Sequence, residues 1–210
     1  PVEYNLEGIN QVNVHEEIGL TFASALKAFL RQDPNIVMVG EIRDMETSSI
    51  AVKAALTGHL VLSTLHTNDA PSTINRMIDM GVEPFLVSSS VNLILAQRLV
   101  RKLCAKCKKQ VKIHPEAMRE LGIANEEPFD IYEVVGCPTC NNTGYSGRMG
   151  LYEVMPISEE ISEMVLNRCS ASEIKAQAVK EGMYTLRVDG ISKLRAGTTS
   201  LEEVLRETTS

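Results

Sequence analysis

A carboxylate and two imidazoles flank two short apolar runs of this chain. Glu41 follows the run Ile36–Val39 after a single glycine, and His59 and His66 bracket the run Leu60–Leu62. Parallel-sheet enzymes carry such groups to the carboxyl ends of buried strands, where a phosphate can bind. A carboxylate fixed there could bind Mg²⁺ or orient a water molecule, and an imidazole could polarise a phosphate or accept a proton. The pattern indicates a nucleotide hydrolase without identifying one.

Each of these residues also has a plainer interpretation. Glu41 could be a solvated strand-end glutamate paired with Arg43, and either histidine could be half-buried with its hydrogen bonds satisfied. What favours a site is the polar loop after the second run. It contains the side chains of Ser63, Thr64, Thr67, Asn68 and Asp69.

Cysteine spacing points to a second kind of chemistry. Cys104 and Cys107 form one C-x-x-C pair, and Cys137 and Cys140 form another. Two thiolates at this spacing can hold one face of a tetrahedral ion, so the pairs predict a zinc site, with redox disulfides as the alternative. Four thiolates leave no open coordination position, which indicates a structural role. Cys169 has no partner at a useful spacing, and we expect it only to pack.

Composition bounds the remaining possibilities. The chain has 210 residues and a formal net charge of −6, which argues against general binding to nucleic acids or anionic membranes. No apolar run approaches the roughly 18 to 20 residues of a membrane span. The zinc-type cysteine pairs, together with the lack of a signal-peptide pattern, lead us to expect a reducing cytoplasm. Because the first residue is Pro and not Met, we expect a piece of a longer polypeptide.

Apolar periodicity and turn residues predict alternating strands and helices in the first part of the chain, hence an α/β layer fold with a mostly parallel sheet. Another strand is expected at 151–155, with helices from Ser158 onward. We divide the chain into an α/β core (1–97), a tetracysteine module (98–147) and a C-terminal strand and helical region (148–210). The expected elements of the core are strands at 8–14, 36–39 and 59–64, and helices at 22–30, 46–57, 71–80 and from Pro84 towards Leu95.

Four segments, in order along the chain, resemble the C-terminal half of the secretion ATPases that drive type II secretion and type IV pilus assembly. PVEYNLEGINQVNV is similar to the end of that family's aspartate box, and NIVMVGEIRD to its Walker B segment. AALTGHLVLSTLHTND resembles the histidine box, and LCAKCKK with GCPTCNNTGYSGRMGLYEV resembles the tetracysteine zinc module. The resemblance implies a RecA-like P-loop NTPase core, truncated at its N-terminus so that the P-loop strand is missing. A zinc-binding insertion and a helical C-terminal region would follow.

The resemblance also implies roles for individual residues, with ATP, Mg²⁺ and Zn²⁺ as cofactors. Glu41 would coordinate Mg²⁺ through water or activate the attacking water, and His59 and His66 would lie near the γ-phosphate. Glu3 falls on the last acidic position of the aspartate box. Arg43 and Thr64 are candidate contacts to the nucleotide. The zinc ligands would be Cys104, Cys107, Cys137 and Cys140.

Members of the resembled family form homo-hexamers in the cytoplasm, held at the inner membrane through a platform protein. One departure is that no G-x-x-x-x-G-K-[ST] loop occurs in this sequence, so we expect the chain alone to bind ATP very weakly. The alternatives are a zinc-ribbon-like binding module without catalytic activity and a pilus retraction ATPase. Retraction ATPases usually lack the four cysteines.

Overall fold

The computed structural model describes residues 2–208, which group into two compact units, each considered by itself. Unit 1 contains residues 2–67, 71–92 and 157–175, and unit 2 contains residues 68–70, 93–156 and 176–208. Among the residues that the structure describes, none of the helices combines the length and the apolar character that a bilayer span requires.

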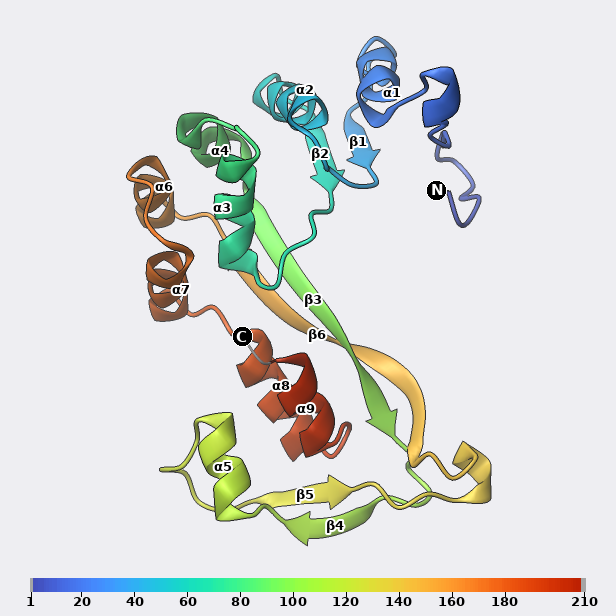
Figure 1. Ribbon diagram of the computed structural model, residues 1–210, viewed down its shortest axis with the longest axis vertical. Coiled ribbons are helices and arrows are strands. Elements are labelled where there is room, and N and C mark those ends of the chain that lie inside the picture. The colour runs from blue at the N-terminus through green and yellow to red at the C-terminus, as the bar shows by residue number, and fades with distance from the viewer. Residues whose placement is uncertain (1, 209–210) are drawn as a thin grey trace. The chain divides into compact units, whose positions relative to one another are not determined.

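Unit 1 is built around a parallel pair of strands. β1 (Ile36–Val39) and β2 (Leu60–Ser63) pair in register from Ile36 opposite Leu60 to Val39 opposite Ser63. α2 (Met45–Leu56) connects them, and α1 (Phe22–Phe29) precedes them (Figure 1). The remaining elements are a 3₁₀ turn at Glu16–Ile18, α3 (Ala70–Asp79, whose first residue belongs to unit 2), α4 (Pro84–Ser90) and α6 (Glu159–Leu166).

Side-chain alternation along the strands determines which face of this pair is buried. Val37 and Val39 pack against Leu26 of α1 and Ala51 of α2. The residues of the opposite face are exposed, although they are equally apolar, because successive strand residues point to opposite sides. These exposed residues, called the open sheet face below, are Ile36, Met38, Leu60 and Leu62.

Unit 2 is organised by a long antiparallel ribbon. β3 (Leu93–Leu103) pairs with β6 (Tyr145–Pro156), with a register shift between Arg101 and Leu103. A second antiparallel pair joins β4 (Lys109–Lys112) to β5 (Asp130–Glu133). The other elements are α5 (Pro115–Leu121), a 3₁₀ turn (Pro138–Cys140), α8 (Leu186–Arg195) and α9 (Leu201–Glu207), while α7 (Ala171–Lys180) passes from unit 1 into unit 2.

The core of unit 2 lies where α8 and α9 meet the strands. Both helices lie beside the ribbon (Figure 1), and Leu194 of α8 and Val204 of α9 are fully buried. An ion pair between the buried Glu203 and the partly exposed Arg101 also links the ribbon to α9. The carboxylate of Glu203 accepts hydrogen bonds from the backbone N–H (2.7 Å) and Nη2 (2.8 Å) of Arg101. This part of unit 2 is therefore fixed by both apolar packing and ionic bonds.

Most expected elements are confirmed, and two expectations are wrong. Residues 8–14 form no strand, because no described segment pairs with them, and Ile9 and Val12 are exposed. The helix from Pro84 ends at Ser90, since the chain from Leu93 onward pairs with β6. The parallel pairing expected in the first part of the chain holds for β1 and β2, whereas the antiparallel pairs β3–β6 and β4–β5 form separate sheets in unit 2.

The expected segment boundaries fall inside strands. Residue 97 lies within β3 and residue 147 within β6, because the ribbon leads directly to the cysteine region and back. Contacts therefore group the chain differently from the three expected segments, whose separate roles stay a prediction.

Candidate nucleotide site and candidate metal centre

The carboxyl ends of β1 and β2 meet because the two strands run parallel. The backbone N–H of Ile42 donates to the carbonyl of Thr64 at 3.0 Å, just beyond the paired strands. The Thr64 hydroxyl donates to the carbonyl of Gly40 at 2.7 Å. These two bonds fix the residue that follows Gly40, which is Glu41.

Glu41 is the centre of a small charged cluster. Its Oε2 accepts hydrogen bonds from Nε of Arg43 at 2.7 Å and from Nε2 of His66 at 3.1 Å. Only 18% of the Glu41 side chain is exposed, against 65% for Arg43 and 85% for His66. The Arg43 guanidinium lowers the pKa of Glu41 below its ordinary value, and His66 adds to this effect while partial burial opposes it. Glu41 is therefore an anchored anion, and its two partners are open to a ligand.

This arrangement has some of the groups that phosphate chemistry uses. An ionised carboxylate can order a water molecule or bind a hydrated divalent cation, while an exposed guanidinium and imidazole can face negative phosphate oxygens. Arg43 pairs with Glu41 rather than with the neighbouring Asp44. The Asp44 carboxylate caps α2, accepting from the backbone N–H of Thr47 at 2.7 Å.

The structure does not bring every candidate residue to this cluster. His59 precedes β2, whereas His66 follows it, and a strand rises about 3.3 Å per residue, so the two histidines lie beyond opposite ends of the strand. His59 Nδ1 is 3.0 Å from the carbonyl oxygen of Ala54, where it closes the end of α2. Glu3 is exposed in a segment without helix or strand. Glu41, Arg43, Thr64 and His66 do come together.

The four cysteines that were predicted to bind zinc converge in unit 2. All four are free thiols, and their Sγ atoms lie within 4.8 Å of one another. Sγ–Sγ distances are 3.9 Å for Cys104–Cys137, 3.9 Å for Cys107–Cys140 and 3.7 Å for Cys137–Cys140. A tetrahedral zinc ion with bonds of about 2.3 Å requires sulfur separations of about 3.8 Å. The cluster therefore fits a Zn²⁺ ion.

Backbone N–H groups prepare this centre for a cation. Cys140 Sγ accepts from the N–H groups of Cys137 and Gly144, each at 3.2 Å. Although burial raises the pKa of the Cys140 thiol, these bonds outweigh it and bring the pKa to about 6. Burial raises the pKa of Cys107 to about 12, so that thiol would lose its proton only to a bound metal.

The turn that carries the second cysteine pair requires a glycine at position 136. Gly136 has φ +106°, and a Cβ there would lie 2.8 Å from the carbonyl oxygen of Asn142. Any larger residue would push apart the turn that brings Cys137 and Cys140 together. Position 136 therefore has to be glycine if the two cysteines are to keep this arrangement.

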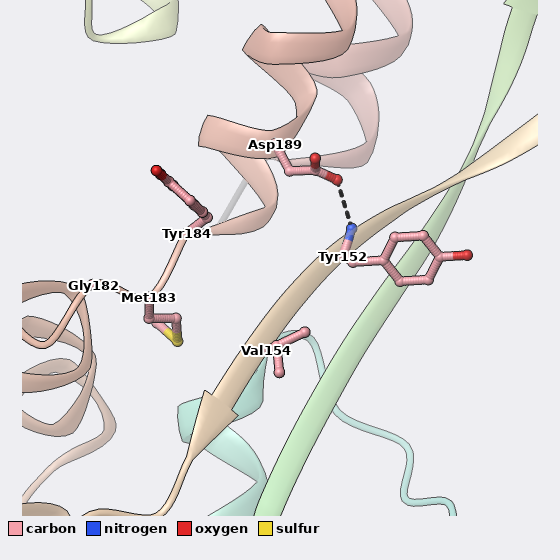
Figure 2. A pocket seen from close by; sticks show the side chains of 6 residues that line it. All are labelled: Tyr152, Val154, Gly182, Met183, Tyr184 and Asp189. Carbon is pink, nitrogen blue, oxygen red and sulfur yellow. Dashed lines mark hydrogen bonds between the residues drawn. The ribbon is translucent and has the colours of Figure 1, made fainter.

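A separate hollow of about 280 Å³ lies in unit 2 between β6 and the start of α8 (Figure 2). The backbone N–H of Tyr152 donates to Asp189 Oδ2 across one side of it at 2.8 Å, while the Tyr152 ring points away from Tyr184. Its lining consists of Tyr152, Val154, Gly182, Met183, Tyr184 and Asp189. None of these residues belongs to the strand-end cluster or to the cysteine centre.

Comparison with known proteins places this α/β chain among secretion-system proteins. The profile of the family described as Type II/IV secretion system protein matches residues 1–206. The chain therefore belongs to this family.

Two curated relatives illustrate the similarity. The type IV pilus assembly ATPase PilB of Myxococcus xanthus is 56% identical over 99% of this chain and 37% of its own length. The type II secretion system ATPase E of Vibrio cholerae is 46% identical over 99% of this chain and 41% of its own length. The chain thus spans roughly two fifths of the length of these relatives.

Solved structures support the same fold. The pilus retraction motor PilT with bound ADP has a TM-score of 0.63 and 26% identity, over 91% of this chain and 45% of that one. The ATPase DotB of Yersinia pseudotuberculosis has a TM-score of 0.67 over 99% of this chain and 47% of that one. Its identity is 20%, so this second likeness concerns the fold alone.

Among the buried polar residues that sequence reasoning missed is Glu153. It lies in β6 between Leu151 and Met155, all on the inward face of the strand, and only 1% of its surface is exposed. A glutamate in the apolar row of a period-two pattern is the signal that could have identified it.

Proposed function

We propose that this chain contributes the strand-end part of an ATP site to a homo-hexameric motor. ATP hydrolysis by this motor powers assembly of a type IV pilus or of a type II secretion pseudopilus. The observation that carries the proposal is the Glu41–Arg43–His66 cluster at the ends of a parallel strand pair. The similarity to a pilus assembly ATPase, 56% identity over 99% of this chain, supports the proposal.

In this proposal Glu41 orients the attacking water, directly or through a hydrated Mg²⁺ ion. Magnesium supplies positive charge that neutralises phosphate oxygens. Arg43 exchanges its bond to Glu41 for a bond to a phosphate oxygen of the nucleotide, bound either to the same subunit or to a neighbouring one. His66 hydrogen-bonds to the γ-phosphate. Thr64 holds the two strand ends together and contacts the nucleotide. His59 and Glu3 keep the roles that the family resemblance assigns them only if they approach the nucleotide after it binds.

The cysteine centre is proposed to be a structural zinc site. The sulfur separations and the backbone donors to Cys140 fit four thiolate ligands, and such a site leaves no coordination position for chemistry. The ion would fix the end of the ribbon where β3 passes into β4 and where β6 begins.

The open sheet face supports the proposal that further polypeptide completes the ATP site. A sheet of two strands is marginal in water by itself, and exposed aliphatic residues of this kind mark a surface that is normally covered. We infer that the polypeptide bearing the phosphate-binding loop packs over Met38 and its neighbours. The motor would work in the cytoplasm and act on the fibre through an inner-membrane platform protein.

The test joins residues 1–210 to the upstream part of the Myxococcus xanthus relative, giving what we call the joined polypeptide. We expect it to hydrolyse ATP, whereas Glu41→Gln lowers turnover at least about 100-fold, because loss of a catalytic carboxylate typically costs that much. Glu46→Gln is the matched control, since it removes the same charge from an exposed residue of unit 1 that pairs with Lys27. Unchanged turnover in Glu41→Gln would contradict the proposal. Salt-dependent binding of DNA or RNA without any turnover would favour a binding module instead.

A further inference from the structure

Glu153 is a buried acid that neither site uses. Its side chain is 1% exposed, and its neighbours on the inward face of β6, Leu151 and Met155, are fully buried. Burying a carboxylate is costly unless hydrogen bonds compensate it, so its partners indicate what it does.

Those partners are the first N–H groups of two helices. Oε1 accepts from the N–H of Ala70 at 2.8 Å, and Oε2 accepts from the N–H of Leu186 at 3.3 Å. Ala70 begins α3 and Leu186 begins α8. The first N–H groups of a helix have no partner within it, and the helix dipole favours an anion there. One side chain therefore satisfies two helix starts at once.

The first of these helix starts is joined to the strand-end cluster by the chain itself. Residues 68–70 belong to unit 2 and follow His66 after a single residue, Thr67. A second side chain binds the start of the same segment. Arg98 of β3 donates from Nη2 to the carbonyl oxygen of Asn68 at 3.3 Å and to its Oδ1 at 3.1 Å. Each strand of the ribbon thus contributes one side chain that binds the segment 68–70, which begins two residues after His66.

We propose that Glu153 is a positioning residue for His66. Together with Arg98 it fixes residues 68–70 on the β3–β6 ribbon. The loop that carries His66 therefore moves when unit 2 moves. A displacement of unit 2 during the ATPase cycle is thereby passed to the imidazole that hydrogen-bonds to Glu41. This inference rests on the proposed function for its chemistry, but the attachment of residues 68–70 to the ribbon can be measured without ATP turnover.

The first measurement is amide hydrogen exchange on the joined polypeptide. Glu153→Gln keeps the size of the side chain but presents an NH₂ group to one of the two donors, so one bond is lost. We expect exchange in residues 68–70 to rise about tenfold, with exchange in β1 and β2 unchanged. Arg98→Met should give a smaller rise in the same segment and serves as the second variant if Glu153→Gln does not fold. Lys102→Met, an exposed residue on the same strand, is the charge-matched control. Unchanged exchange in both variants would overturn the inference.

The second measurement separates positioning from general stability. If Glu153 acts through His66, Glu153→Gln lowers kcat about tenfold with the KM for ATP changed less than about twofold, and it has no further effect in a His66→Ala background. Multiplicative losses in the double variant would overturn the positioning role. Absence of hydrolysis by the unsubstituted joined polypeptide would reject the proposed function instead. The exchange result would then test only whether Glu153 and Arg98 hold residues 68–70 on the ribbon.

Discussion

The strand-end cluster and the cysteine centre differ in how much of each is built from nearby residues. All four thiols come from two short turns, and their sulfur atoms already have the spacing that one ion needs. Glu41 has an anchored position, but 85% of the His66 side chain and 65% of the Arg43 side chain are exposed. The difference shows that a site made from local turns can be complete within this chain. A site made at the ends of parallel strands depends on which other strands join the sheet.

This comparison predicts that the largest effect on stability comes from the cysteine centre. Chelation of the metal, or Cys140→Ser, should remove bound zinc and loosen the turns around both cysteine pairs. The thermal midpoint should fall by many degrees, because binding of structural zinc is worth on the order of 10 kcal/mol in small domains. Metal analysis and thermal unfolding measure these effects. Cys169→Ser is the control, since that thiol lies outside the cluster and should leave the zinc content at one ion per chain. Equal thermal midpoints with and without metal would contradict a structural role for the cysteine centre.

At the strand ends we expect only a small effect on stability, with a defined dependence on pH. Arg43 lowers the folded-state pKa of Glu41, so the resulting stability is present above the ordinary pKa of glutamate. It is lost as the pH falls through the lower folded-state value. Arg43→Met should raise the pKa of Glu41 and shrink this contribution while hardly changing the midpoint at neutral pH.

Titration of the Glu41 carboxyl carbon by NMR measures this change. Arg31→Met removes an exposed cation elsewhere in unit 1 and should leave the Glu41 titration where it is. An unchanged pKa in Arg43→Met would mean that the pair in the cluster is not the cause of the shift.

Local signals in the sequence predicted a large part of the fold. The strand Ile36–Val39 has the predicted bounds, and the helix predicted at 22–30 is found as α1 (Phe22–Phe29). The N-terminal strand failed because strand propensity cannot reveal whether a partner strand exists. β3 was missed as a strand because Pro84 and the apolar residues after it also suit a helix. The pairing with β6 that decides the matter involves residues far away in the sequence.

The sites show the same division between local and distant information. The cysteine pairs were identifiable because ligand spacing within a turn follows from the sequence alone. The meeting of Glu41 with His66 could be expected once the two strands were taken as parallel. The position of His59 at the far end of β2 follows from the same argument, and attention to strand direction would have set it apart. The contacts of Glu153 with two helix starts depend on tertiary packing, which no local pattern contains.

Native mass spectrometry of the 210-residue chain, with Zn²⁺ and an ATP analogue supplied together, tests the contrast between the two sites most directly. We predict one zinc ion per chain and no stoichiometric nucleotide, because the thiolate ligands are complete and the sequence contains no phosphate-binding loop. Tight binding of the nucleotide, or a chain without zinc at saturating Zn²⁺, would contradict this account.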